Sequence, residues 1–304
     1  MASAYTTALE RPDPLRALLR LLWRPGMLGR DFTWAIAFVV PYIAIFLAFV
    51  VYPVGYGLWL GSDLSKYPAL FEDPVYPRAV MNTLIYLVVA VNLKLFLALL
   101  ISGFFMRRDW WIRILLLIFV LPWAVPGIPT FLSFRWMLNG QWGLINSGIW
   151  NFFQMDGPPW LDRPDLALSS IIVCYIWKWT PFWTVIFLAG RMSIPRELYE
   201  AADVDGATGL GRFTHVTFPL LANLYLVCTL LSTIWALGDF NIVRFVTGGG
   251  PALSTHVLAT LGIRDAFEIG DPAMGMAVVI SALPLLIPLV IILMRKLAKG
   301  EVQL

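Results

Sequence analysis

The amino-acid sequence predicts an all-α protein that crosses a membrane six times, and both its composition and its charge pattern support this prediction. Of the 304 residues, 59% are hydrophobic and 13% are charged, whereas soluble domains average about 45–50% apolar and about 25% charged residues. The charged residues gather between long apolar stretches, which is typical of helices in a bilayer joined by loops in water. The net charge of +3 therefore reflects loops beside a membrane, and no nucleic-acid partner is expected.

A spanning helix needs about 20 mainly apolar residues, and six stretches meet this requirement. They cover approximately residues 32–58, 80–106, 112–137, 168–190, 220–243 and 274–294. We accordingly divide the chain into an N-terminal segment, 1–31, and a six-helix transmembrane domain, 32–304.

The N-terminal segment does not resemble a signal peptide, because no apolar core and cleavage site follow its basic residues. Arg16, Arg20 and Arg24 recur at every fourth position, while leucines occupy the opposite face. This pattern predicts a short helix lying on the inner surface of the membrane. A frayed tail is the alternative.

The loops predict the orientation, since Lys and Arg accumulate on the cytoplasmic side of a membrane protein. The basic loops and ends carry Arg11, Arg16, Arg20, Arg24, Arg30, Arg107, Arg108, Arg113, Arg191, Arg196, Arg212, Arg295, Lys296 and Lys299. The other loops carry fewer basic residues, mixed with acids. Both termini and the polar segment 194–219 are therefore expected in the cytoplasm, and an even number of spans agrees with this.

The third span contains three prolines, Pro122, Pro126 and Pro129. Proline lacks a backbone donor and clashes with the preceding helical turn, so this span must kink or break. The freed carbonyls need hydrogen-bond partners from neighbouring helices. We therefore expect the third span to pack inside the helix bundle rather than against lipid.

Segment 194–219, IPRELYEAADVDGATGLGRFTHVTFP, is the only long polar interruption in the second half of the chain. Pro195 suits the first position of a helix, and Glu197 and Glu200 favour the positive end of its dipole. Gly206 after an aspartate predicts a sharp turn. A second short helix is expected at about 210–216, leading to Pro219 and the next span. The segment is thus predicted to form two helices beside the membrane, suited to docking into a protein cleft.

This segment resembles the EAA loop of permease subunits in ATP-driven bacterial importers. Their pattern runs E-A-A, two residues, D-G-A, and about eight residues later I-x-L-P; here Val216 and Phe218 replace the isoleucine and leucine and keep the apolar character. We call 194–219 the coupling segment, because the resemblance implies that it binds an ATPase subunit. The implied ATPase-coupling residues are Glu197, Glu200, Ala201, Ala202, Asp205, Gly206, Ala207 and Pro219. An ordinary cytoplasmic loop is the alternative.

Two loops expected on the outer side of the membrane narrow the resemblance from importers in general to those for carbohydrates. The sequence TGGGP at 247–251 lacks the GxxxxGK[ST] pattern of a phosphate-binding loop and is similar to the loop before the last helix in maltose and glycerol-phosphate type permeases. The connection 138–167 contains G-x-x-N and W-L-x-x-P, which resemble the corresponding loop of sugar permeases. Its glycines, prolines and tryptophans predict an ordered cap at the outer surface, available to a partner.

An ionisable side chain inside a span is costly and therefore a functional candidate. Asp239 is the strongest of these, because its carboxylate can accept hydrogen bonds from sugar hydroxyls. Trp235 and Trp179 offer aromatic faces to a sugar, and Asn241 offers further hydrogen bonds. These four residues are the substrate-path candidates, although most of the 14 tryptophans are expected in interfacial belts.

Asp239 has an equally plausible structural interpretation, as an ion-pair partner of Lys94, Lys178 or Arg244. For both lysines, structural pairing is favoured over transport. Cys174 and Cys228 lie in apolar spans and are expected to be buried and unpaired, and neither His215 nor His256 has ligands at metal spacing. No metal site and no cofactor are expected in this chain.

The resemblance implies a type I ABC importer permease fold and a permease subunit of a carbohydrate importer in a bacterial inner membrane. It implies four kinds of partner besides membrane lipid: a second homologous permease, two ATP-binding subunits, an extracytoplasmic solute-binding protein and a sugar. ATP and magnesium would be bound by the ATPase subunits, so this chain is not expected to be an enzyme. The alternatives are an ion-coupled secondary transporter, which should show matching repeats and ion-binding carboxylates at broken helices, and a membrane-embedded enzyme. The sequence leaves the particular carbohydrate open.

Overall fold

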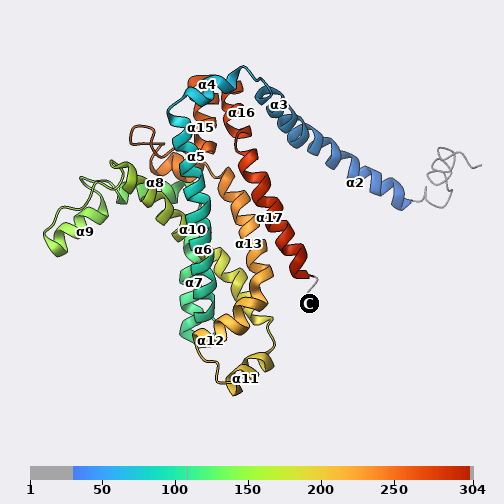
Figure 1. Cartoon of the computed structure of the whole chain (residues 1–304), viewed down its shortest axis with the longest axis vertical. Helices are drawn as coiled ribbons and strands as arrows, with labels where there is room; N and C mark the ends of the chain where they lie inside the picture. The colour runs from blue at the N-terminus through green and yellow to red at the C-terminus, as the bar shows by residue number, and fades with distance from the viewer. Residues whose placement is uncertain (1–29, 108, 302–304) are drawn as a thin grey trace, which may run out of the picture. The chain divides into compact units, whose positions relative to one another are not determined.

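A computed structural model describes residues 30–107 and 109–301, and every regular element among them is a helix (Figure 1). The predicted helix around Arg16, Arg20 and Arg24 lies outside the described residues. Four short π-helical turns are labelled η: η1, η2 and η3 lie within longer helices, and η4 extends α15. The elements are α2 (Arg30–Phe46), η1 (Leu47–Val51), α3 (Tyr52–Gly61), α4 (Lys66–Glu72), α5 (Val75–Ile85), η2 (Tyr86–Val91), α6 (Asn92–Phe104), α7 (Trp110–Ala124), α8 (Gly127–Met137), α9 (Leu144–Phe153), α10 (Pro164–Met192), α11 (Arg196–Val204), α12 (Leu210–Arg212), η3 (Phe213–Thr217), α13 (Phe218–Gly238), α14 (Asn241–Val246), α15 (Leu258–Ile263), η4 (Arg264–Ile269), α16 (Pro272–Ile280) and α17 (Leu283–Glu301).

The chain forms two units, residues 1–59 and 60–304. The first unit consists, in its described part, of α2, η1 and most of α3. These elements join into one apolar helix, Trp34–Gly61, which is long enough to cross a membrane. It matches the first predicted span, 32–58.

The second unit is built around α6, which packs along α10. Leu95, Ala98 and Leu99 of α6 are fully buried in one core with Ile171 and Phe187 of α10. The small side chain at Ala98 lets the two helices approach closely, and the larger side chains fill the space beside it. Cys174 and Cys228 are buried and free, as predicted.

Three further helices, Val75–Phe104, Pro164–Met192 and Leu210–Gly238, are long and apolar enough to span a membrane. They correspond to the predicted spans 80–106, 168–190 and 220–243. The last of these begins ten residues earlier than predicted and ends at Gly238, because the chain turns at Asp239 before α14.

The third predicted span is broken, as its prolines predict. Helices α7 and α8 meet at 93° around Val125 and Pro126, and counting them as one span brings the total in the described residues to five. The prediction that this span packs inside the bundle is wrong for α7 in this chain, since Ile112 is its only buried residue. The reason is that α7, apart from Arg113, is apolar on all sides, while α10 covers only one of them.

The sixth predicted span, 274–294, is divided between α16 and α17 by a turn at Ser281 and Ala282. A count of six spans therefore remains a prediction.

The connection between α8 and α10 is ordered, as predicted, and Asn146 of α9 holds it together. The Asn146 amide donates to the carbonyl oxygens of Gly140 (2.8 Å) and Pro158 (3.2 Å), and its Oδ1 accepts a hydrogen bond from Trp160 Nε1 (2.7 Å). Gly157 lies so close to Asn146 Oδ1 that a Cβ there would be 2.1 Å away. These contacts explain why the loop needs Gly157 and Asn146.

Candidate functional site

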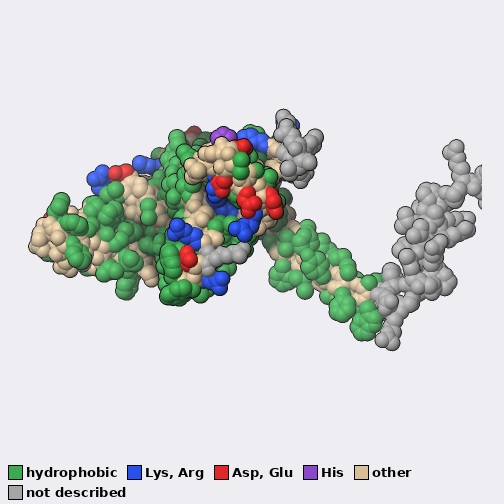
Figure 2. All heavy atoms as spheres, turned by 90° about the horizontal axis from the view of Figure 1, so that it is seen from below, with side chains coloured by type: hydrophobic (Ala, Val, Ile, Leu, Met, Phe, Trp, Pro, Cys, Tyr) green, Lys and Arg blue, Asp and Glu red, His purple; other side chains and the backbone are tan. Residues whose placement is uncertain are grey.

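The coupling segment lies at the end of the second unit opposite α4, α15 and α16 (Figure 1). Seen from that end, acidic and basic side chains gather on one face amid hydrophobic ones (Figure 2). Helix α11 begins directly after Pro195, and Glu197 lies in its first turn, as the sequence predicts. The acidic side chain is favoured there because the helix dipole is positive at this end.

The turn after α11 is a Schellman motif, in which a residue in the left-handed conformation closes the helix. Gly206 has φ of +77°. The amide of Ala207 donates to Ala202 O (2.8 Å), and the amide of Gly206 donates to Asp203 O (3.1 Å). The D-G-A part of the motif thus ends the helix and fixes the direction in which the chain leaves it.

Two side-chain contacts attach α11 to the helix that follows. The hydroxyls of Tyr199 and Thr217 are 3.2 Å apart, and Arg212 forms an ion pair with Asp203. Ala202 packs inward and is 8% exposed. This small residue lets α11 lie close to its own chain, and the predicted contact of Ala202 with an ATPase subunit stays a prediction.

The remaining predicted coupling residues are accessible. Glu197, Glu200, Ala201, Asp205, Gly206 and Pro219 are exposed, and Ala207 is half-buried. Sequence reasoning missed two exposed apolar side chains on the same helix, Leu198 and Val204, which are 43% and 89% exposed. Their apolar side chains, isolated within a polar segment, could have predicted an exposed docking surface.

The second helix of the coupling segment is not separate from the next span, which differs from the prediction. α12, η3 and α13 form one continuous helix of 29 residues, Leu210–Gly238, about 43 Å long at 1.5 Å per residue. The π-helical turn η3 lies directly before Pro219, and the helix continues through the proline without a break. One end of this helix contacts α11, and the other reaches Trp235 and Asp239.

At that other end, a cavity of about 430 Å³ is lined by all four substrate-path candidates, Trp179, Trp235, Asp239 and Asn241. The Asp239 carboxylate accepts a hydrogen bond from the backbone N–H of Asn241 at 3.1 Å. Trp179 Nε1 is buried and has no partner within the described chain. Trp235 is 50% exposed, so the cavity is open at the surface of the isolated chain.

Lys94 also lines this cavity, although the sequence prediction did not assign it there. It is 1% exposed, and its Nζ donates to Tyr175 Oη (2.8 Å) and Ser232 Oγ (2.6 Å). The same nitrogen lies 4.3 Å from the centre of the Tyr175 ring. The sequence around Lys94 does not predict these partners, because Tyr175 and Ser232 come from two other helices.

None of the three predicted ion-pair partners forms a salt bridge with Asp239 in the described residues. Lys94 bonds to hydroxyls, and Arg244 pairs with Glu268. Lys178 donates to Pro122 O (2.8 Å) and to Val125 O. The carbonyls released by the break between α7 and α8 are thus satisfied by a lysine from α10, as the need for partners predicted.

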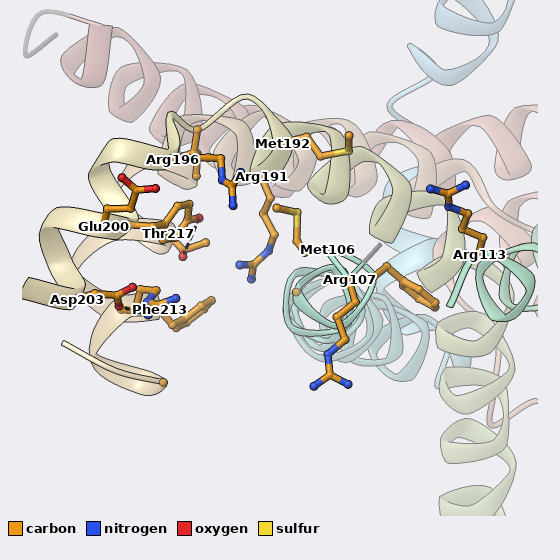
Figure 3. Close-up of a pocket in the computed structure, with 16 residues that line it drawn as sticks. Met106, Arg107, Arg113, Arg191, Met192, Arg196, Glu200, Asp203, Phe213 and Thr217 are labelled. Atoms are coloured by element: carbon orange, nitrogen blue, oxygen red, sulfur yellow. Dashed lines mark hydrogen bonds and ion pairs between the residues drawn. The ribbon is translucent and has the colours of Figure 1, made fainter. Parts of the chain in front are cut away.

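A second cavity, of about 900 Å³, lies beside the coupling segment and is rich in arginine (Figure 3). Arg191, at the end of α10, is buried there: its Nε donates to Ser102 Oγ (2.7 Å) and its Nη2 to Leu99 O (2.9 Å). A Cβ at Gly103 would lie 3.5 Å from the Arg191 guanidinium. The guanidinium therefore binds the carboxyl end of α6, where helix carbonyls lack partners.

Three comparisons relate this chain to known proteins. Residues 94–300 match the family described as "Binding-protein-dependent transport system inner membrane component". The chain is 33% identical over 263 residues to the sulfoquinovosyl glycerol transport system permease protein SmoG of Agrobacterium fabrum, covering 81% of this chain and 84% of SmoG. It is 30% identical over 270 residues to the trehalose/maltose transport system permease protein MalF of Thermococcus litoralis, covering 84% and 91%.

Among solved structures, a chain of a bacterial alginate ABC transporter, crystallised in complex with an alginate pentasaccharide-bound periplasmic protein, superposes with a TM-score of 0.76. The two chains are 22% identical, and the match covers 88% of this chain and 96% of the other. This likeness concerns the fold.

Proposed function

Because the chain belongs to the family of binding-protein-dependent transport system inner membrane components, we propose that it is the permease subunit of an ATP-driven carbohydrate importer. It is a multi-pass membrane protein and a transport component rather than an enzyme. In this role it forms the translocation path with a second permease and receives movement from ATPase subunits through the coupling segment.

The observation that carries this proposal is the continuous helix Leu210–Gly238. Its first residues are attached to α11 by the Tyr199–Thr217 and Asp203–Arg212 contacts, and its last turn lines the cavity that holds Asp239. An unbroken helix transmits displacement along its axis because every turn is hydrogen-bonded to the next. Movement imposed on α11 would therefore reach the cavity.

The exposed face of α11 is suited to binding another protein. Glu197 and Glu200 supply negative charge, and the exposed Leu198 and Val204 supply apolar surface. Buried apolar anchors ringed by polar groups are the usual composition of a stable interface. ATP-dependent closure of two ATPase subunits would displace α11 and open the cavity outward, and hydrolysis would return it to the inward-facing state.

The outer cavity is suited to a carbohydrate. Its volume of about 430 Å³ falls within the usual range of ligand pockets, about 300–1,000 Å³. Trp235 and Trp183, whose rings are 5.6 Å apart, offer flat apolar surface, while Asp239, Asn241 and the free Trp179 Nε1 offer polar contacts. The relatives SmoG and MalF carry names of transport systems for sugar-containing solutes, which favours the same class here.

The proposed role as a permease subunit implies an assembly with other subunits. The exposed Trp235 and Ile234 leave the cavity open on one side, where a second, homologous permease would close it. Two ATP-binding subunits would bind ATP and magnesium, and an extracytoplasmic solute-binding protein would deliver the sugar. Both termini and the coupling segment would then lie in the cytoplasm of a bacterial cell, as the distribution of basic residues predicts.

Co-purification tests the proposal. A tagged chain, purified from its native membrane in mild detergent, is expected to retain an ATPase and a second permease. Proteoliposomes of this complex should take up sugar only when binding protein and ATP are supplied. Uptake driven by an ion gradient without ATP would favour the secondary transporter instead and would overturn the proposal.

A further inference from the structure

The proposed function assigns no ligand to the arginine-rich cavity beside the coupling segment. Five arginines line it, against two acidic residues, Glu200 and Asp203. Since Arg212 pairs with Asp203, the cavity retains an excess of positive charge. An excess of positive charge in a cavity of about 900 Å³ indicates an anionic occupant.

Three of the arginines have guanidinium groups available for such an occupant. Arg107, Arg113 and Arg196 are exposed, and their side chains form no hydrogen bond or ion pair within the described residues. They come from the α6–α7 connection, the first turn of α7 and the start of α11. In Figure 3, Arg107 and Arg113 lie on the side opposite to Glu200 and Asp203, while Arg191 and Arg196 point into the space between.

The depth of the cavity in the membrane is indicated by its neighbours. It lies where α6 ends at Phe104, α7 begins at Trp110 and α10 ends at Met192. Trp110 is 73% exposed and Trp111 is 40% exposed. Exposed tryptophans at helix ends mark the level of lipid headgroups, so the arginines lie at the depth of lipid phosphates.

An apolar surface continues from the cavity along α7. Ile114, Leu117, Ile118 and Leu121 are all exposed, and Leu117 is 71% exposed. An acyl chain can pack along this surface while its phosphate remains among the arginines. A soluble anion would make no use of it.

We propose that this cavity binds the headgroup of an anionic phospholipid. Basic pockets between spanning helices are suited to this chemistry, because guanidinium groups bind phosphate oxygens in pairs. Tyr199 and Glu200 of the coupling segment line the same cavity, so a bound lipid contacts the segment that the proposed function assigns to ATPase coupling. The inference rests on the cavity and remains testable if that function is wrong.

The test compares the wild-type complex with a triple variant, Arg107→Gln, Arg113→Gln and Arg196→Gln. Arg135→Gln is the matched control, because Arg135 is also exposed but does not line the cavity. Native mass spectrometry measures phosphatidylglycerol retained after reconstitution into vesicles of phosphatidylcholine with or without phosphatidylglycerol. Each lost arginine should weaken binding about fivefold, whereas the control should bind like the wild type.

Thermal unfolding in neutral detergent establishes that the variants fold, since none of the three side chains holds the structure together. Wild type should melt at a higher temperature with phosphatidylglycerol than with phosphatidylcholine, and the triple variant should not respond. Equal retention of lipid by wild type and triple variant would overturn the proposal. Displacement of the lipid by inorganic phosphate would assign the site to a soluble anion, and loss of the ATPase from the purified triple variant would assign it to an acidic protein surface; either result rejects the lipid.

Discussion

Replacing Gly206 with alanine tests whether the Schellman turn transmits movement from α11. The φ of +77° at this residue disfavours any side chain, and a Cβ there would meet no atom within 4 Å. The cost therefore comes from the backbone alone, about 1–2 kcal/mol for a left-handed L-residue. A cost of this size lowers the equilibrium constant for forming the local turn about 5- to 30-fold, and it does not disturb the core.

Gly211→Ala provides the matched control, because it adds the same methyl group five residues away. Gly211 lies in α12, and its Cβ would make an ordinary contact 3.8 Å from Ala207 Cβ. Alanine is favoured over glycine in a helix by about 1 kcal/mol, so this variant should be slightly stabilised. Gly206→Asn is a second control, since asparagine tolerates the left-handed conformation better than alanine.

Hydrogen exchange and uptake together measure the effect. In Gly206→Ala, the backbone amides at positions 206 and 207 should lose protection against hydrogen exchange about 5- to 30-fold. The amount of sugar transported per ATP hydrolysed should fall. Gly206→Asn should recover part of both, and Gly211→Ala should retain wild-type values. If Gly206→Ala loses protection but transports sugar with unchanged efficiency, the turn is not a mechanical link.

Three further predictions concern polar contacts elsewhere. Lys178→Met removes the donor to the carbonyls at the helix break and should destabilise the protein by about 1–3 kcal/mol, seen as a lower melting temperature in detergent; melting like wild type would contradict this role. Asp239→Asn should reduce sugar uptake while the amount of inserted protein stays the same, and unchanged uptake kinetics would exclude a substrate contact. A hydrogen bond from Lys66 lowers the pKa of Asp271, and the same bond raises the pKa of Lys66. The stabilisation from this pair is therefore complete between the ordinary values of 3.8 and 10.5 and is lost as the pH falls through the lowered Asp271 value or rises through the raised Lys66 value. Lys66→Met should weaken the acid part of this dependence in pH-resolved thermal melts, leaving the part due to the backbone hydrogen bond from Met274, and an unchanged acid limb would refute the role of Lys66.

Much of the fold follows from local properties of the sequence. Apolar runs predict where helices cross the membrane, since each run must hide its backbone polar groups within itself. Pro126 predicts the break between α7 and α8, and Pro195 and Gly206 predict the start and end of α11. Each of these features depends on a residue's own backbone conformation, which neighbouring helices do not alter.

Other features depend on how helices are rotated against one another. Lys178 bonds to carbonyls 53 to 56 residues away, and Lys94 bonds to hydroxyls on two other helices. The apolar pattern of a membrane helix is nearly uniform around its axis, so it does not indicate which side faces which neighbour. For the same reason, the sequence did not predict that α7 is largely uncovered in this chain.

The sequence by itself determined the membrane class, the helix positions and the family of the coupling segment, because these depend on composition and on residues close together in the chain. Only the tertiary structure decided that Ala202 faces inward, that one helix joins α11 to the cavity, and that Lys94 and Asp239 line the same space without pairing. These features depend on the packing of distant side chains, where a change in helix rotation exchanges one set of partners for another.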